Sequence, residues 1–214
     1  MATITALRIM PRRRGRVAVY VDGRLRLMVD PAVAASLSIG LAFDEATLAD
    51  LQGRQAVEAG LQKAGRLLAR RPRSEFELRT ALRKSGGSDE TVEAVVDRLK
   101  DAGQIDDERF ARTWLEDRAA FRPRSALGLR AELQRKGLRR EIVDQALSGF
   151  SEDEAAVEAA RRAVRRWRGA DEAERRRRMV AYLQRRGFGH ETITAAVRRV
   201  TAESAASGES EGEL

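Results

Sequence analysis

Adjacent carboxylates are the side chains of this sequence that could most directly perform acid–base chemistry. Asp106 precedes Asp107, and Asp153 precedes Glu154. Two carboxyl groups can act as general acid and general base when a cleft holds them around a substrate. Each pair, however, lies where the pattern predicts the start of a helix, and acidic side chains at that position stabilise the helix dipole. We therefore expect both pairs to cap helices rather than to catalyse a reaction.

Composition limits the other catalytic and metal-binding chemistry. The sequence has no cysteine, which excludes thiol nucleophiles, disulfides, iron–sulfur clusters and thiolate zinc sites. His190 is the only histidine, so a site with several histidine ligands cannot form. Gly86 and Gly87 follow a predicted helix rather than a strand, which is not the position of a phosphate-binding loop. We expect no enzymatic activity, no cofactor and no metal ion.

Arginine is the residue whose abundance points to binding. Lys and Arg number 41 against 33 Asp and Glu, a formal net charge of +8, and only four of the 41 are lysines. A guanidinium group binds a phosphate or a carboxylate through two hydrogen bonds at once. A basic protein therefore favours a polyanionic partner, either a nucleic acid or an acidic protein groove. GC-rich coding would raise the arginine content without any binding role.

Some of these bases occupy positions that local helix stability does not favour. Arg175–Arg178 is a run of four cations at the start of a predicted helix, where the helix dipole disfavours positive charge. Basic pairs also precede three turn glycines, at Arg83–Lys84, Arg135–Lys136 and Arg185–Arg186. These pairs are either ordinary cations at helix C-termini or a basic stripe that follows an extended anionic partner.

The elements that must position these bases begin with strands. Residues 17–21 and 25–29 alternate apolar and other side chains around Asp22 and Gly23, which is typical of a β-hairpin with a tight turn. Residues 4–9 could add a third strand. Short capped helices are expected between this sheet and the repeats that follow.

The remaining sequence repeats a helical pattern three times. Two apolar residues and a glycine recur at four-residue spacing, 51 and then 50 residues apart, as Leu78, Leu82 and Gly86; Leu129, Leu133 and Gly137; Met179, Leu183 and Gly187. Each repeat contains three helices, and the last two, joined at the glycine, are typical of a helix-turn-helix. Trp114 and Trp167 lie on predicted apolar faces, which favours core packing over base stacking.

We therefore predict a mainly α-helical protein. Three tandem three-helix, helix-turn-helix-like repeats form an elongated solenoid with a shared core, after a small N-terminal β-hairpin or sheet. The predicted segments are 1–54 (hairpin and short helices), 55–104, 105–152 and 153–200 (the three repeats), and 201–214 (a disordered acidic tail). No apolar run is long enough to span a bilayer.

Three stretches carry a resemblance to a known family. They are Arg73–Leu82, with the pattern RSExELRxxL; Ile105–Gly137, which begins IDDxxFA and ends ELxxKG; and Tyr182–Phe188. In this order they resemble the RecX family, the bacterial regulators of the RecA recombinase. The resemblance covers roughly residues 4–200. Arg122–Ser125 departs from it, because many members carry glycines there, so a role that needs a flexible glycine loop is not carried over.

The resemblance implies a non-enzymatic protein that lies in the groove of the RecA–single-stranded-DNA filament. There it would modulate ATP hydrolysis, strand exchange and coprotease activity, with inhibition as the expected direction. It also implies a cytoplasmic monomer, without a membrane partner, that regulates DNA repair, homologous recombination and the SOS response. Single-stranded DNA would be bound weakly or indirectly. The expected partner contacts are Arg73, Arg122, Arg124, Arg135, Lys136, Arg139, Arg140, Arg161, Arg165, Arg185 and Arg186.

The alternative function is a stand-alone helix-turn-helix regulator that reads duplex DNA. Recognition helices present side chains such as Asn, Gln or Arg to base edges from their N-terminal halves. Here the third helices of the repeats carry Glu90, Glu141 and Glu191 near their starts. Glutamate at these positions would face phosphates poorly, so the filament regulator is the favoured function.

Overall fold

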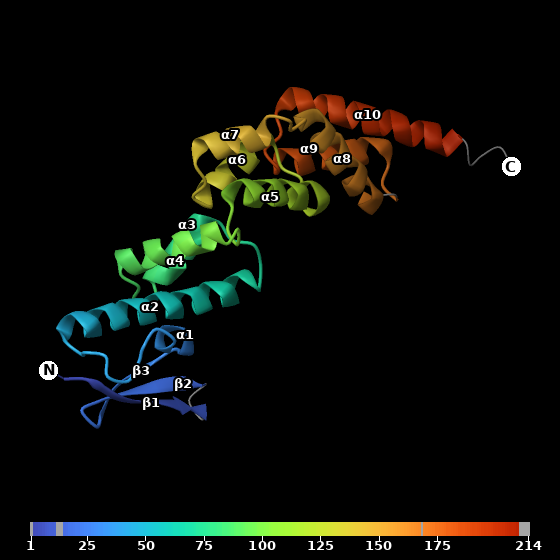
Figure 1. The fold of residues 1–214 in the computed structure, drawn as a ribbon. Coiled ribbons are helices and arrows are strands. Elements are labelled where there is room, and N and C mark those ends of the chain that lie inside the picture. Colours follow the sequence, from blue (N-terminus) through green and yellow to red (C-terminus); the bar gives the residue numbers. More distant parts are fainter. Residues whose placement is uncertain (1, 12–14, 168, 210–214) are drawn as a thin grey trace. The chain divides into compact units, whose positions relative to one another are not determined.

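The chain opens with a three-stranded antiparallel sheet, and helices form the rest (Figure 1). The computed structural model describes residues 2–11, 15–167 and 169–209, and the chain divides into two compact units between Asp106 and Asp107. This mainly helical architecture, with a small N-terminal sheet before three three-helix repeats, confirms the predicted fold class.

The sheet has the order β1 (Ile4–Met10), β2 (Arg16–Val21) and β3 (Arg24–Val29). Asp22 and Gly23 connect β2 and β3 with φ of +48° and +76°, the left-handed geometry that a tight hairpin turn requires. The alternating valines of β2 turn one face of the sheet toward an apolar core. Both the hairpin and the third strand were expected from the sequence.

Two helices cover the core side of the sheet. The first is α1 (Pro31–Ala34), which Asp30 caps by accepting a hydrogen bond from the backbone N–H of Ala32. It ends at Ala34. The second is α2 (Glu45–Leu68), capped by Asp44.

The predicted boundary between residues 54 and 55 falls inside α2, which continues to Leu68. Leu51 of this helix packs under the sheet, and Ala64 of the same helix packs in the core of the first repeat. The 24-residue helix contains no proline that would interrupt it. One helix therefore contributes to two cores. Its first half packs against the sheet and its second half against the first repeat, without a break in the helix.

The first repeat combines the second half of α2 with α3 (Glu75–Arg83) and α4 (Asp89–Asp101). Ser74 caps α3 by accepting a hydrogen bond from the backbone N–H of Glu77, an arrangement that is typical of a Ser-x-x-Glu sequence at a helix start. The core of this repeat consists of Ala64, Leu78, Leu82, Val92, Val95, Val96, Leu99 and Ile105.

The second compact unit contains the other two repeats. The second repeat comprises α5 (Asp107–Phe121), α6 (Ala126–Arg135) and α7 (Arg140–Leu147). The third repeat comprises α8 (Glu152–Val164), the short 3-10 helix η2 (Arg165–Trp167), α9 (Glu172–Gln184) and α10 (His190–Glu209).

Corresponding positions in the three repeats have the same structural role. Leu82, Leu133 and Leu183 are all buried. The turn glycines all adopt the left-handed conformation, with φ of +87° at Gly86, +79° at Gly137 and +84° at Gly187. Glycine adopts this conformation at little cost, which is why the pattern ends each middle helix with it.

The C-terminal end differs from the sequence prediction. The prediction placed disorder from residue 201, but α10 continues to Glu209. Residues 201–209 are rich in alanine, which favours helix, and Glu203 accepts hydrogen bonds from Arg161 of α8 and Arg199 of α10. The alanines and this ion pair favour a helix in a segment for which the acidic composition had predicted disorder. Residues 210–214, the rest of the predicted tail, lie outside the described residues.

No helix in the described part of the chain is long and apolar enough to cross a membrane.

Candidate partner-binding surface

The carboxylate pairs lie where the sequence placed them. Asp107 is the first residue of α5, and Asp153 and Glu154 lie in the first turn of α8. Ser151 caps α8 by accepting a hydrogen bond from the backbone N–H of Glu154 at 3.3 Å. Within the described residues, no three His, Asp or Glu side chains are grouped so that they could hold a metal ion. These acidic pairs serve the helix starts, and the basic residues are the remaining candidates for function.

Several of the predicted contact residues are engaged within the protein. Arg73 donates from Nε to the carbonyl of Leu67 at 3.3 Å, and Arg135 donates to the carbonyl of Ala131 at 3.1 Å. Arg161 forms a two-bond ion pair with Glu203, with Nε 2.8 Å from Oε2. These contacts stabilise the fold and make the three guanidinium groups less available to a partner.

Trp114 organises a second group of internal contacts, in the second repeat. The guanidinium of Arg118 lies 4.0 Å from the centroid of its ring, and the Lys136 ammonium lies 4.9 Å from it. The indole N–H donates to Glu132 at 3.0 Å, and Phe110 stacks on the ring. The indole packs against the apolar core and holds Lys136 over its ring, which is the core-packing role expected for this tryptophan.

Glu132 is the anion at the centre of this group. Burial alone would raise its pKa, but hydrogen bonds from Arg118 and Trp114, with the charges of Arg118 and Arg124, hold that pKa below its usual value. Arg124 lies at a longer 3.4 Å from the carboxylate and keeps much of its side chain exposed. Glu132 therefore neutralises Arg118 more fully than Arg124.

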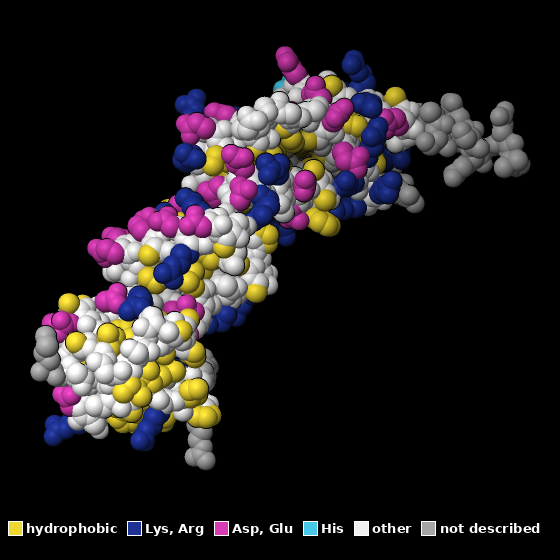
Figure 2. Space-filling model, in the orientation of Figure 1, with side chains coloured by type: hydrophobic (Ala, Val, Ile, Leu, Met, Phe, Trp, Pro, Cys, Tyr) yellow, Lys and Arg dark blue, Asp and Glu magenta, His cyan; other side chains and the backbone are white. Residues whose placement is uncertain are grey.

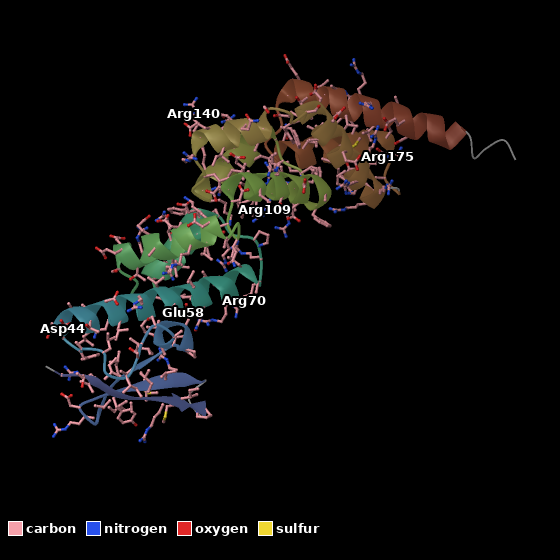
Figure 3. The ribbon with its side chains drawn as sticks, in the orientation of Figure 1. Asp44, Glu58, Arg70, Arg109, Arg140 and Arg175 are labelled. Atoms are coloured by element: carbon pink, nitrogen blue, oxygen red, sulfur yellow. The ribbon has the colours of Figure 1, made fainter. Side chains whose placement is uncertain are left out.

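Another part of the predicted set is open. Arg140, labelled in Figure 3, has a side chain that is 81% exposed. Its ion pair with Asp144 is long, with 3.5 Å between Nε and the carboxylate. The remaining open residues share an exposed side chain that makes no hydrogen bond or ion pair within the described part of the chain. They are Arg122, Arg139, Arg165 and Arg185.

The basic pairs at the three turns are not equivalent, although their sequences are. In the first repeat Arg83 pairs with Asp89 at 2.9 Å. In the second, Arg135 bonds to backbone and Lys136 covers Trp114. In the third, neither Arg185 nor Arg186 has an acidic partner among the described residues. On the face that Figure 2 shows, blue and magenta side chains are mixed over the second compact unit.

Arg186 brings together bases that are distant in the sequence. Its guanidinium lies 3.5 Å above the ring of Tyr182, and its Nε is buried without a hydrogen-bond partner. Burial lowers its pKa most, and the nearby positive charges of Arg124, Arg166 and Arg185 lower it further. Arg166 was absent from the predicted contact set. Arg166 follows Arg162 by four residues, and the side chain of Arg162 donates to the carbonyl of Ala119 near the end of α5. This spacing was the sequence signal available for Arg166, because residues four apart lie on the same side of a helix.

Known proteins match the chain over the same repeats. Family models for the first, second and third three-helix domains of RecX match residues 61–99, 106–147 and 151–197. The regulatory protein RecX of Thermobifida fusca is 38% identical over 126 residues, which cover 58% of this chain and 68% of that protein. The regulatory protein RecX of Chlorobaculum tepidum is 32% identical over 148 residues, covering 69% and 92%. A crystal structure of regulatory protein RecX superimposes with a TM-score of 0.70 at 23% identity, covers 90% of this chain and 97% of that one, and so supports the fold. The chain therefore belongs to the RecX family of regulatory proteins.

Proposed function

We propose that this protein binds the filament that RecA forms on single-stranded DNA and modulates its ATPase, recombinase and coprotease activities, most directly by inhibition. The observation that carries the proposal is the succession of three RecX three-helix domains along the chain. The protein acts by binding, as a cytoplasmic monomer, and it regulates DNA repair by recombination.

Electrostatic attraction supplies the physical basis for this binding. Arg122, Arg139, Arg165 and Arg185 carry exposed charges that no internal anion neutralises in the described part of the chain. Such charges steer a protein toward an anionic surface and form hydrogen bonds with its carboxylates or phosphates. A bound regulator changes filament activity only if it binds one filament state more tightly than another. The open arginines are therefore the proposed contacts that distinguish those states.

Co-sedimentation with RecA filaments on single-stranded DNA tests the proposal, with bare single-stranded and duplex DNA as controls. We expect strong retention by the filament, weak retention by bare DNA, and a lower rate of RecA ATP hydrolysis. Retention by bare duplex DNA, without preference for the filament, would favour the stand-alone DNA-binding regulator. Glu90, Glu141 and Glu191 near the starts of α4, α7 and α10 oppose that alternative, because they repel phosphates.

Charge reversal identifies the contact residues. In the double variant Arg122→Glu/Arg139→Glu, filament retention should weaken by more than about tenfold, since about 1.4 kcal/mol corresponds to a factor of ten. The matched control is Arg112→Glu/Arg198→Glu, which reverses two exposed arginines outside the proposed contact set. Equal losses in both doubles would indicate a nonspecific charge effect. No loss in either would exclude these arginines from the interface.

A further inference from the structure

We propose that Arg124, Arg166, Arg185 and Arg186 form a binding site for a phosphate group, supplied by the backbone of a single nucleic-acid strand. The four side chains come from three separate segments of the second compact unit. Arg124 lies in the connection between α5 and α6, Arg166 in η2, and Arg185 and Arg186 at the end of α9. The site is argued from its own charges and does not depend on the proposed action on RecA.

One backbone hydrogen bond and one side chain outside the group hold these segments together, without using the guanidinium groups of the four arginines. The N–H of Ser125 donates to the carbonyl of Arg186 at 3.2 Å, which joins the α5–α6 connection to the turn after α9. Arg162 donates to the carbonyls of Ala119 and Ala120, which joins the end of α8 to the end of α5. Arg124, Arg166 and Arg186 are therefore positioned by a fixed framework rather than by a ligand.

The resulting group carries positive charge for which the described residues supply one acidic partner, Glu132, at 3.4 Å from Arg124. Arg186 is the most constrained member, because its Nε is enclosed without a partner and its guanidinium is fixed over Tyr182. Arginine stays charged at all physiological pH values, so it cannot relieve the repulsion by losing a proton. Glu132 already accepts hydrogen bonds from Arg118 and Trp114, so its charge is shared among three donors. An external anion bound to the group would compensate this charge.

Geometry favours phosphate over carboxylate as that anion. A carboxylate presents two oxygens in one plane and suits a single guanidinium fork. A phosphate presents oxygens in a tetrahedral arrangement, so donors that approach from three segments can bind it together. The backbone of a single strand also carries one charge per nucleotide, which allows the exposed Arg166 and Arg185 to bind a phosphate next to the one at Arg186.

The first test measures binding of a fluorescein-labelled oligo-dT by fluorescence anisotropy at several salt concentrations. The double variant Arg166→Ala/Arg185→Ala should bind about tenfold or more weakly than the unaltered protein, with a shallower salt dependence by about 0.7 per lost phosphate contact. The charge-matched control Arg112→Ala/Arg198→Ala should lose less than about threefold. Both pairs are exposed, so the unfolding midpoints should stay unchanged. Equal affinity of the two doubles would overturn the site.

The second test identifies the anion with NMR of the Arg186 Nε–H group, whose burial slows exchange with water. Oligo-dT should shift this signal at low concentration, and inorganic phosphate should shift it in the same direction at higher concentration. If only inorganic phosphate shifts it, the source is a free phosphate and not a nucleic-acid strand, which overturns that part of the proposal. If poly-glutamate shifts it and displaces oligo-dT as well as phosphate does, the site takes carboxylates and the proposal fails. Neither measurement contains RecA, so its outcome is separate from that of filament co-sedimentation.

Discussion

Truncation of Leu133 to alanine should destabilise the second compact unit strongly. Leu133 of α6 is fully buried, in the core formed with Phe110, Ala111, Leu138 and Val143. Removing a buried leucine side chain costs roughly 2–5 kcal/mol of unfolding free energy, through lost burial and the cavity that remains. Leu127 lies on the same helix but is 74% exposed, so Leu127→Ala should change stability by no more than about 0.5 kcal/mol. The pair isolates burial, because the chemical change and the helix are the same.

Tryptophan fluorescence during thermal unfolding is the appropriate assay. The protein has two tryptophans, Trp114 and Trp167, and both lie in the second compact unit, so their signal follows that unit selectively. A loss of about 2 kcal/mol should lower the midpoint by about 8 °C or more, at about 4–8 °C per kcal/mol for a domain of this size. The reasoning is refuted if the two variants have the same midpoint, since Leu133 would then contribute no more than an exposed leucine.

Three further predictions concern individual contacts. Gly187→Ala should destabilise the second unit by more than about 2 kcal/mol in the same assay. The backbone φ of +84° is unfavourable for alanine, and its Cβ would lie 2.9 Å from the Ser125 Oγ that caps α6. A loss below about 1 kcal/mol would contradict this. Glu203→Gln removes the carboxylate that binds Arg161, so the backbone amides of residues 201–209 should exchange hydrogen faster, and unchanged protection would show that this ion pair does not hold the end of α10. Because the pKa of Glu132 is lowered in the folded protein, its ionised form stabilises the fold above its unfolded pKa of about 4.3, and this contribution is lost as the pH falls through the lower folded value. The unaltered protein should therefore be more stable than Glu132→Gln at pH 6, with the gap closing below about pH 4, and a gap that did not change with pH would count against the pKa shift.

Local chemistry made much of the fold predictable. Asp22–Gly23 specified a turn that only a few residue types adopt. The middle helices start at the caps Ser74, Ser125 and Asp171, and a turn glycine follows each of them. The sequence pattern could not show into which core each helical face packs. The continuity of α2 across residue 54 depends on a sheet and a repeat that use one helix, and this partnership is not visible in the helical period alone.

The candidate site was less predictable, because the availability of an arginine depends on its neighbours in space. Arg161 and Arg165 have the same type and the same helical context in the sequence. The first is neutralised by Glu203, 42 residues away, whereas the second has no partner among the described residues. The sequence identified the basic turns, but it could not reveal that Arg185 and Arg186 of the third turn have no acidic partner among the described residues. The role of these residues in partner binding stays a prediction.

The length of α2 has a mechanical consequence. A helix of 24 residues is about 36 Å long at 1.5 Å per residue, and it is a stiff rod with a buried anchor in each of two cores. A hinge needs a loop or an element end that absorbs a change in backbone angles, and α2 offers none between Leu51 and Ala64. A displacement of the sheet would therefore be transmitted to α3 and α4 rather than absorbed at a joint. The strands and the first repeat should therefore move together as one rigid body.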